Sequence, residues 1–150
     1  MIKLDTEKII DKKFINIPYK FGGQSFDGAD CMGIILLWYK EQGIVFDYDE
    51  STAKRMKVFW ERRPAEFLTL VSQFGSFIPF HEIKKYDFLL FFGDGKDETF
   101  PSFPAVMVDD RYFLSNIYRT KSFTKMIDVD WKTRFWGAIK ISKAVDMGIR

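Results

Sequence analysis

Hydrophobic and polar positions in the first half of the chain follow the period of a helix. The segment 5–14 opens on polar residues that suit a helix start, carries its apolar side chains on one side, and is ended by Pro18. The segment 31–42 is apolar nearly all round, follows Asp30 as a capping residue, and is ended by Gly43. Because a helix that is apolar on all sides is buried, this second segment is predicted to lie at the centre of the fold.

Helical spacing continues to residue 74 and then gives way to the pattern of strands. Further helices are expected over 52–62 and over 64–74. Later segments are apolar and rich in aromatic or β-branched residues, which favours strands over 87–92, 103–109, 111–116 and 135–141. Helices that precede strands, rather than alternate with them, indicate an α+β fold with N-terminal helices packed on a mostly antiparallel sheet.

Length and composition are those of one globular domain. The chain has 150 residues, so a single domain over 1–150 is expected. Aromatic residues make up 18% of the chain, and most of these rings are expected in the core. The formal net charge of +2 is too small to indicate a nucleic-acid partner.

The sequence carries no pattern that would direct it to or across a membrane. The first ten residues, MIKLDTEKII, lack the apolar stretch of a secretory signal. The longest apolar runs are far shorter than the ~20 residues that a spanning helix needs. The sequence therefore predicts a protein made in the cytoplasm, with no signal peptide and no membrane span.

Cys31 is the only cysteine of the chain, and His81 is the only histidine. A single cysteine permits no internal disulfide, and one cysteine with one histidine is a poor ligand set for a metal, so no metal and no cofactor are expected. Cys31 lies at the predicted start of the central helix, where a helix N-terminus stabilises a thiolate nucleophile. The alternative is that Cys31 is an ordinary small, buried hydrophobic residue.

Three short motifs around this cysteine occur together in one known family. They are Pro18-Tyr19, Gly22-Gly23 and Asp30-Cys31-Met32-Gly33, and the segment KKYDFLLFF (84–92) adds a strand that follows an aspartate. With this combination the chain resembles, from about residue 6 to 118, the NlpC/P60 family of papain-like cysteine peptidases of bacterial cell walls. The segment FWGAIKI (135–141) fits as a last strand.

The resemblance implies a fold and an activity. Family members have the papain-like fold and cleave the peptide stems of peptidoglycan. They use a cysteine nucleophile, here Cys31, and Tyr19 would place its hydroxyl near it in the cleft. The bulky Met32 and the closing YKEQGI (39–44) are more similar to the versions in phage tail tips than to those in secreted enzymes.

The resemblance also implies a histidine base at the start of the second strand and a polar third residue at the end of the third. The base position falls on Phe103, or on Pro104 if the register is shifted by one. The third position falls on Ser115, with Asn116 beside it. Neither Phe nor Pro can accept a proton, and loss of a positioned base costs about 10²–10⁴ in rate. His81 is expected in an exposed loop at the far end of the sheet.

The sequence is therefore interpreted as a degenerate NlpC/P60 domain of a phage or phage-like tail or baseplate. Its expected role is that of a structural or docking module, made in the bacterial cytoplasm and associated with the virion. Its expected partners are other tail proteins and peptidoglycan. In this interpretation Phe103 and its neighbours Phe100, Pro101 and Pro104 fill the former cleft.

Two alternatives stay open. The first is an active cell-wall endopeptidase that uses Cys31 during penetration of the host wall, with an unrecognised base or with His81 brought back by its loop. The second is a bacterial housekeeping pseudoenzyme.

Overall fold

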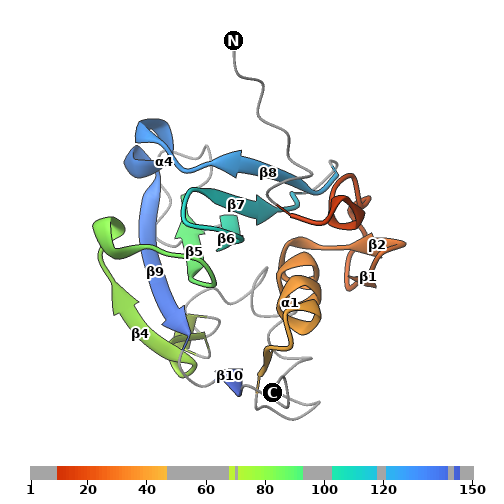
Figure 1. The fold of residues 1–150 in the computed structure, drawn as a ribbon, viewed down its shortest axis with the longest axis horizontal. Helices are drawn as coiled ribbons and strands as arrows, with labels where there is room; N and C mark the ends of the chain where they lie inside the picture. The colour runs from red at the N-terminus through yellow and green to blue at the C-terminus, as the bar shows by residue number, and fades with distance from the viewer. Residues whose placement is uncertain are drawn as a thin grey trace.

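The computed structural model describes residues 10–46, 68–69, 71–92, 103–117, 121–141 and 144–145. A six-stranded sheet with the strand order β4-β9-β5-β6-β7-β8 forms its centre (Figure 1). Every neighbouring pair in this sheet is antiparallel. In the order of the sheet, the strands span Gly75–Ile78, Phe135–Ile141, Phe88–Phe91, Phe103–Met107, Tyr112–Ser115 and Phe123–Met126.

Helix α1 (Cys31–Glu41) packs on one face of the sheet, against β6 and β7. Successive side chains of a strand point to opposite faces, and the buried residues divide into two clusters in the same way. The cluster on the α1 face joins the apolar side chains of α1 to those of the sheet, among them Phe88, Leu90, Val106, Val108, Tyr112, Leu114 and Ile139.

The opposite face of the sheet carries a second cluster, which is rich in aromatic rings. Its buried members are Leu89, Phe91, Phe103, Ala105, Met107, Phe113 and Ala138. The short helix α4 (Val129–Thr133) brings Trp131 against them, with its ring centroid 4.8 Å from that of Phe113. The two faces are therefore covered by different segments, α1 on one and α4 on the other.

Short elements complete the fold. The 3-10 helix η2 (Lys12–Phe14) and the hairpin of β1 (Gln24–Ser25) and β2 (Gly28–Ala29) precede α1. Strand β3 (Val45–Phe46) pairs with β10 (Ala144–Val145), and the 3-10 helix η3 (Phe80–Glu82) connects β4 to β5.

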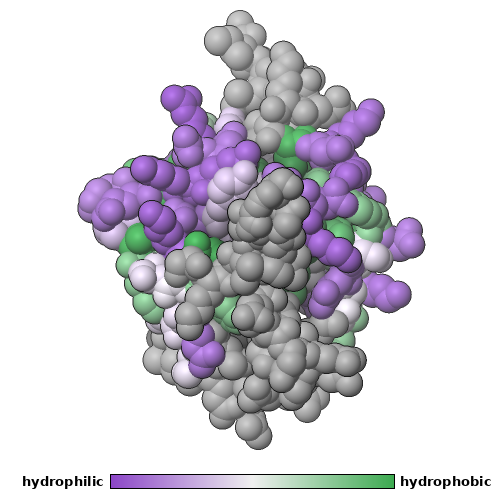
Figure 2. Space-filling view, turned by 60° about the horizontal axis from the view of Figure 1, so that its bottom comes forward, coloured by the Kyte–Doolittle hydropathy of each residue, from purple (hydrophilic) through white to green (hydrophobic). Residues whose placement is uncertain are grey.

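Among the residues coloured in Figure 2, hydrophilic ones dominate the upper left and the right, with smaller hydrophobic areas between them. Large hydrophobic side chains are nevertheless exposed at several places, namely Phe21, Phe26, Phe77, Tyr86, Met126 and Val129. No helix among the described residues is both long enough and apolar enough to cross a membrane.

The predicted α+β class and antiparallel sheet are confirmed. The helix expected over 31–42 spans Cys31–Glu41, with Asp30 as its N-cap. The four predicted strands correspond to β5, β6, β7 and β9, and β9 has the predicted bounds.

Three elements of four or more residues were not predicted, namely β4, β8 and α4. Gly75, expected to end a helix, begins β4 instead, and a Cβ atom there would lie 1.9 Å from the carbonyl oxygen of Lys140. Gly75 is therefore needed for the approach of β4 to β9, not for a helix cap. Strand β8 and helix α4 hold polar, partly exposed residues, so the apolar pattern that marks an element is weak in both.

Two predicted helices differ from the structure or fall outside it. The described part of the segment 5–14 forms a 3-10 helix over Lys12–Phe14, not an α-helix. Residues 68–69 and 71–72 are helical within the segment expected over 64–74. The helix expected over 52–62 lies outside the described residues.

Candidate functional site

Asp30 fixes the start of α1 and the loop that precedes it. One carboxylate oxygen accepts from the backbone N–H of Gly33 at 2.6 Å, which caps the helix. The other accepts from the N–H of Gly22 at 2.8 Å, and the side chain is buried. A single carboxylate thus joins the Gly-Gly loop to the helix start, and this sets the position of Cys31, the first residue of α1.

The glycines of the motif are explained by close backbone contacts. A Cβ atom on Gly33 would lie 1.8 Å from the carbonyl oxygen of Gly23, and one on Gly23 would lie 2.4 Å from that of Gly28. Gly22 has φ of +76°, which favours glycine. The Gly-Gly and Asp-Cys-x-Gly motifs therefore describe one packing contact, in which the loop lies directly against the first turn of α1.

Cys31 is buried, with 7% of its surface exposed. Tyr19 is half-buried and lies in the segment before α1. The N–H of Ala29 donates to the carbonyl of Pro18 at 3.1 Å, and the N–H of Lys20 donates to the carbonyl of Ala29 at 3.3 Å. The backbone of Tyr19 is thus held opposite Ala29, which lies two positions before Cys31.

Asn116 joins the end of β7 to the same region. Its side-chain amide donates to the carbonyl oxygens of Ile17 at 3.1 Å and Ala29 at 2.9 Å, and it is completely buried. Asn116 lies directly after β7 and on the α1 side, since Leu114 belongs to the cluster on the α1 face. The end of β7 therefore lies beside the segment that leads into Cys31.

A second buried polar residue, Ser122, supports this arrangement and was not predicted. Its hydroxyl accepts from the N–H of Ile17 at 2.8 Å and donates to the carbonyl of Phe14. Because a lone serine outside any apolar pattern carries no signal in the sequence, only the fold could reveal it.

The two alternative base positions lie on opposite faces of the sheet. Phe103 belongs to the second cluster, away from α1, and its ring centroid lies 5.3 Å from that of Trp131. Val106 belongs to the cluster on the α1 face, so Pro104, two residues earlier, also points to that face. The expectation that Phe103 helps to fill the former cleft is therefore wrong, because its ring is on the far side of the sheet from Cys31. Of the other residues expected there, Pro104 faces α1, and Phe100 and Pro101 lie outside the described residues.

Ser115 and Asn116 also lie on opposite faces of the sheet. Ser115 follows Leu114, so it faces away from α1, and its hydroxyl donates to the carbonyl of Pro104 at 3.0 Å. The pairing of β6 with β7 places Val106 opposite Leu114, and this register continued places Pro104 opposite Asn116. Pro104 and Asn116 are thus the neighbouring side chains on the α1 face at this end of the sheet.

His81 lies in η3, with its side chain 80% exposed and its Nε2 3.8 Å from a carboxylate oxygen of Glu82. Ile78 and Ile83, which flank η3, pack against the second cluster. The sheet therefore separates His81 from Cys31, and the structure does not bring the thiol and the imidazole together.

Two titratable groups with shifted pKa lie near the other end of α1. Burial raises the pKa of Tyr39 well above its usual value, and the negative charge of Asp87 adds to this. Burial also raises the pKa of Asp87. The hydroxyl of Tyr39 donates to the carbonyl of Tyr86 at 2.6 Å. Tyr39 lies eight residues after Cys31 in α1, which is about 12 Å along the helix axis, so these groups are not beside the thiol.

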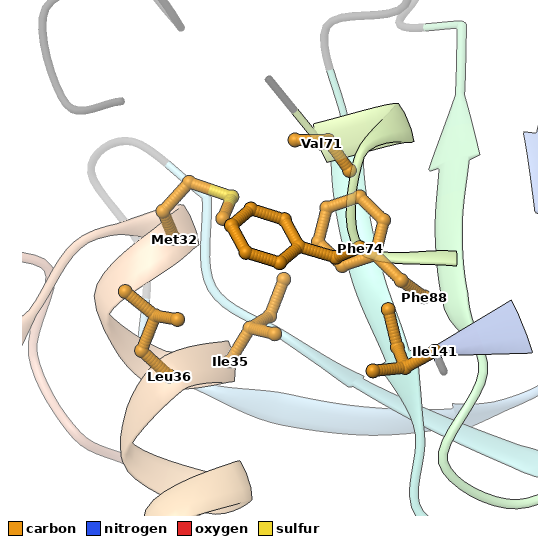
Figure 3. Close-up of a pocket in the computed structure, with 7 residues that line it drawn as sticks. All are labelled: Met32, Ile35, Leu36, Val71, Phe74, Phe88 and Ile141. Carbon is orange, nitrogen blue, oxygen red and sulfur yellow. The ribbon is translucent and has the colours of Figure 1, made fainter. Parts of the chain in front are cut away.

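A small cavity lies between α1 and the sheet, close to Met32 (Figure 3). Its walls are entirely apolar and consist of Met32, Ile35, Leu36, Val71, Phe74, Phe88 and Ile141. Its volume of about 10 Å³ is at the limit for a single water molecule. The cavity is therefore a gap in the core. The described residues also hold no group of three His, Cys, Asp or Glu side chains that could bind a metal ion.

Comparison with known proteins identifies relatives of this arrangement. The model of the NlpC/P60 family matches residues 16–140. No curated protein matches the chain. One similar solved structure is a Staphylococcus aureus protein described as similar to a lipoprotein of the NLP/P60 family. It has a TM-score of 0.56 and 19% identity, over 93% of this chain and 43% of that chain.

Two further structures agree on the fold. An NlpC/P60 family protein from Bacillus cereus has a TM-score of 0.59 and 18% identity, over 92% of this chain and 40% of that one. The NlpC/p60 domain of the peptidoglycan hydrolase SagA has a TM-score of 0.53 and 17% identity, over 92% of this chain and 100% of that domain. The chain therefore spans less than half of the first two proteins and the whole of the SagA domain.

Proposed function

This chain belongs to the NlpC/P60 family, and on that premise we propose that it is a domain without peptidase activity. It serves as a structural or docking module of a phage or phage-like tail or baseplate, as a single domain over 1–150. Its partners are other tail proteins, with peptidoglycan as a weak ligand.

One observation carries the loss of activity, namely that Pro104 occupies the α1 face where β6 begins. The family resemblance expects the histidine base at the start of this strand. Because only the α1 face is turned toward Cys31, we assign the base position to Pro104 and the third position to Asn116, instead of Phe103 and Ser115. A proline side chain has no atom that accepts a proton. Loss of a base from this position costs about 10²–10⁴ in rate.

Asn116 supports the same assignment. In an active family member the third residue orients the base, whereas both bonds given above join the Asn116 amide to the main chain. The Asn116 side chain thus links the end of β7 to the segment before Cys31 by hydrogen bonds.

Exposed aromatic residues support the docking role. Phe21 is 63% exposed and Phe26 is 39% exposed, and both belong to the loop and hairpin that precede α1. The tail or baseplate assignment rests on Met32 and the segment 39–44, whose resemblance to phage tail tips was noted above.

The experiment is the digestion of purified peptidoglycan, with released muropeptides measured by mass spectrometry. We expect the unmodified chain to release no more than Cys31→Ala. Pro104→His in the same assay tests whether the base alone is missing. Release by the unmodified chain that is lost in Cys31→Ala would refute the proposal.

That outcome would support the alternative, an active endopeptidase. The observation in its favour is the intact start of α1, where Asp30 caps the helix and Cys31 is its first residue. The tail assignment is tested by mass spectrometry of particles purified from the strain that encodes the chain. Its presence in cells but not in particles would contradict that assignment and favour a housekeeping pseudoenzyme.

A further inference from the structure

A polar cleft opens on the face of the sheet opposite α1. Its volume is about 190 Å³, and its walls come from the end of β4, from η3 and the turn that leads into β5, and from β9. The lining residues are Ile78, Glu82, Lys84, Lys85, Asp87 and Lys140. Because Ile78 packs against the second cluster, the sheet separates this cleft from Cys31.

Lys84 and Lys140 come from distant parts of the chain and line this cleft beside Asp87. Asp87 is buried, with 5% of its surface exposed, and accepts from the backbone N–H of Lys84 at 2.8 Å. Burial and the negative charge of Asp110 raise the pKa of Asp87, while this hydrogen bond and the positive charges of Lys140 and Lys84 lower it. The lining residues therefore carry three ammonium groups and two carboxylates, which leaves one net positive charge.

The cleft holds two other charged groups. The carboxylate of Glu82 lies 3.8 Å from Nε2 of His81, and the ammonium group of Lys85 lies 5.0 Å from the ring centroid of Tyr86. Within the described part of the chain, Lys84 and Lys140 are in no ion pair. Their ammonium groups are therefore available to a ligand.

We propose that this cleft binds a phosphate group between the ammonium groups of Lys84 and Lys140. A lysine ammonium is a compact, mobile charge that suits phosphate and does not require the fixed geometry of an arginine. The cleft is large enough for a phosphate with bound water, and its lining places both lysines around the same space. The phosphate is either a free ion or part of a phosphodiester polymer.

The test is a titration of the full chain, followed by the amide resonances of Lys84, Lys85 and Asp87 in ¹H–¹⁵N NMR spectra. One arm uses inorganic phosphate and the other a short poly(glycerol phosphate). Both are expected to bind in the millimolar range at low salt and more weakly as salt is raised. Tighter binding of the polymer would identify the phosphodiester as the source, and equal or tighter binding of the free ion would identify inorganic phosphate.

Variants show whether the cleft is the site. Lys84→Gln and Lys140→Gln should each weaken binding about five- to tenfold, and Asp87→Asn should strengthen it because a competing negative charge is removed. Lys125→Gln is the matched control, since Lys125 is an exposed lysine on β8, and it should leave binding unchanged.

No saturable shift with either ligand, or equal weakening by Lys125→Gln, would overturn the proposal. The cleft is independent of the thiol, so Cys31→Ala should bind as the unmodified chain does. Failure here therefore leaves the absence of peptidase activity unaffected.

Discussion

The variant Asn116→Ala tests whether the hydrogen bonds of the Asn116 amide stabilise the fold. In Asn116→Ala, the carbonyls of Ile17 and Ala29 both lose a donor. Neither carbonyl is left without a partner, because Ile17 still accepts from the N–H of Ser122 at 2.9 Å and Ala29 from that of Lys20 at 3.3 Å. The cost is therefore at least that of these two hydrogen bonds and a small cavity, and not that of two orphaned acceptors.

Each such bond contributes about 1 kcal/mol net, so the expected loss is about 2–3 kcal/mol including the cavity. The assay is urea unfolding followed by tryptophan fluorescence. With a slope of about 2 kcal/mol/M, the midpoint should fall by about 1–1.5 M while the slope stays constant.

Ser115→Ala is the matched control on the neighbouring residue. Its hydroxyl is also completely buried but donates only one bond, to the carbonyl of Pro104, so the expected loss is about 1 kcal/mol. If Asn116→Ala lowers the free energy of unfolding no more than Ser115→Ala does, the stabilising role of the Asn116 amide is refuted.

Asn116→Asp adds a pH test of the same contact. The variant carboxylate would face the carbonyl oxygens of Ile17 and Ala29 in a buried site, so it should be more destabilising than alanine at pH 7. Desolvation would raise its pKa in the folded state above the value of about 3.9 in the unfolded chain. Its penalty should therefore decrease as the pH falls, since the protonated form is neutral and can donate one hydrogen bond.

Two further predictions concern the start of α1 and the turn before β5. Gly33→Ala should destabilise the fold although alanine is the better helix former by about 1 kcal/mol, because its Cβ would lie 1.8 Å from the carbonyl oxygen of Gly23; a raised melting temperature would contradict this contact. Burial raises the pKa of Asp87 above its ordinary 3.8, so ionisation costs folding free energy as the pH rises through that value. Asp87→Asn should therefore be more stable than the unmodified chain at pH 7, and the difference measured by urea unfolding should vanish at about pH 3.

The sequence determined the elements whose apolar pattern is strong. The segment 31–42 is apolar on all sides and bounded by Asp30 and Gly43, so both ends of α1 could be predicted. Strands β5, β6 and β7 are buried runs, each two residues shorter than predicted, and β9 has the predicted bounds. The motifs around Cys31 also indicated the family correctly, since their glycines and aspartate are required by the contacts at the start of α1.

Elements with little apolar surface could not be predicted in this way. Strand β8 is half exposed, and α4 contributes Trp131 to the second cluster but is otherwise exposed. What holds such segments in place is pairing and packing with residues distant in sequence, which a local pattern does not record.

The candidate site depended on the tertiary structure at one decisive point. In the run Phe103-Pro104-Ala105-Val106-Met107 every residue is apolar and buried, so polarity gives no indication of which alternate set faces α1. The side-chain period of a strand is two, and a shift of one residue therefore exchanges the two faces. The faces are decided only by the pairing of β6 with β5 and β7 and by the packing of α1 on one side of these strands. This arrangement places Pro104 and Asn116 on the side of Cys31, and it places Phe103 and Ser115 on the other side.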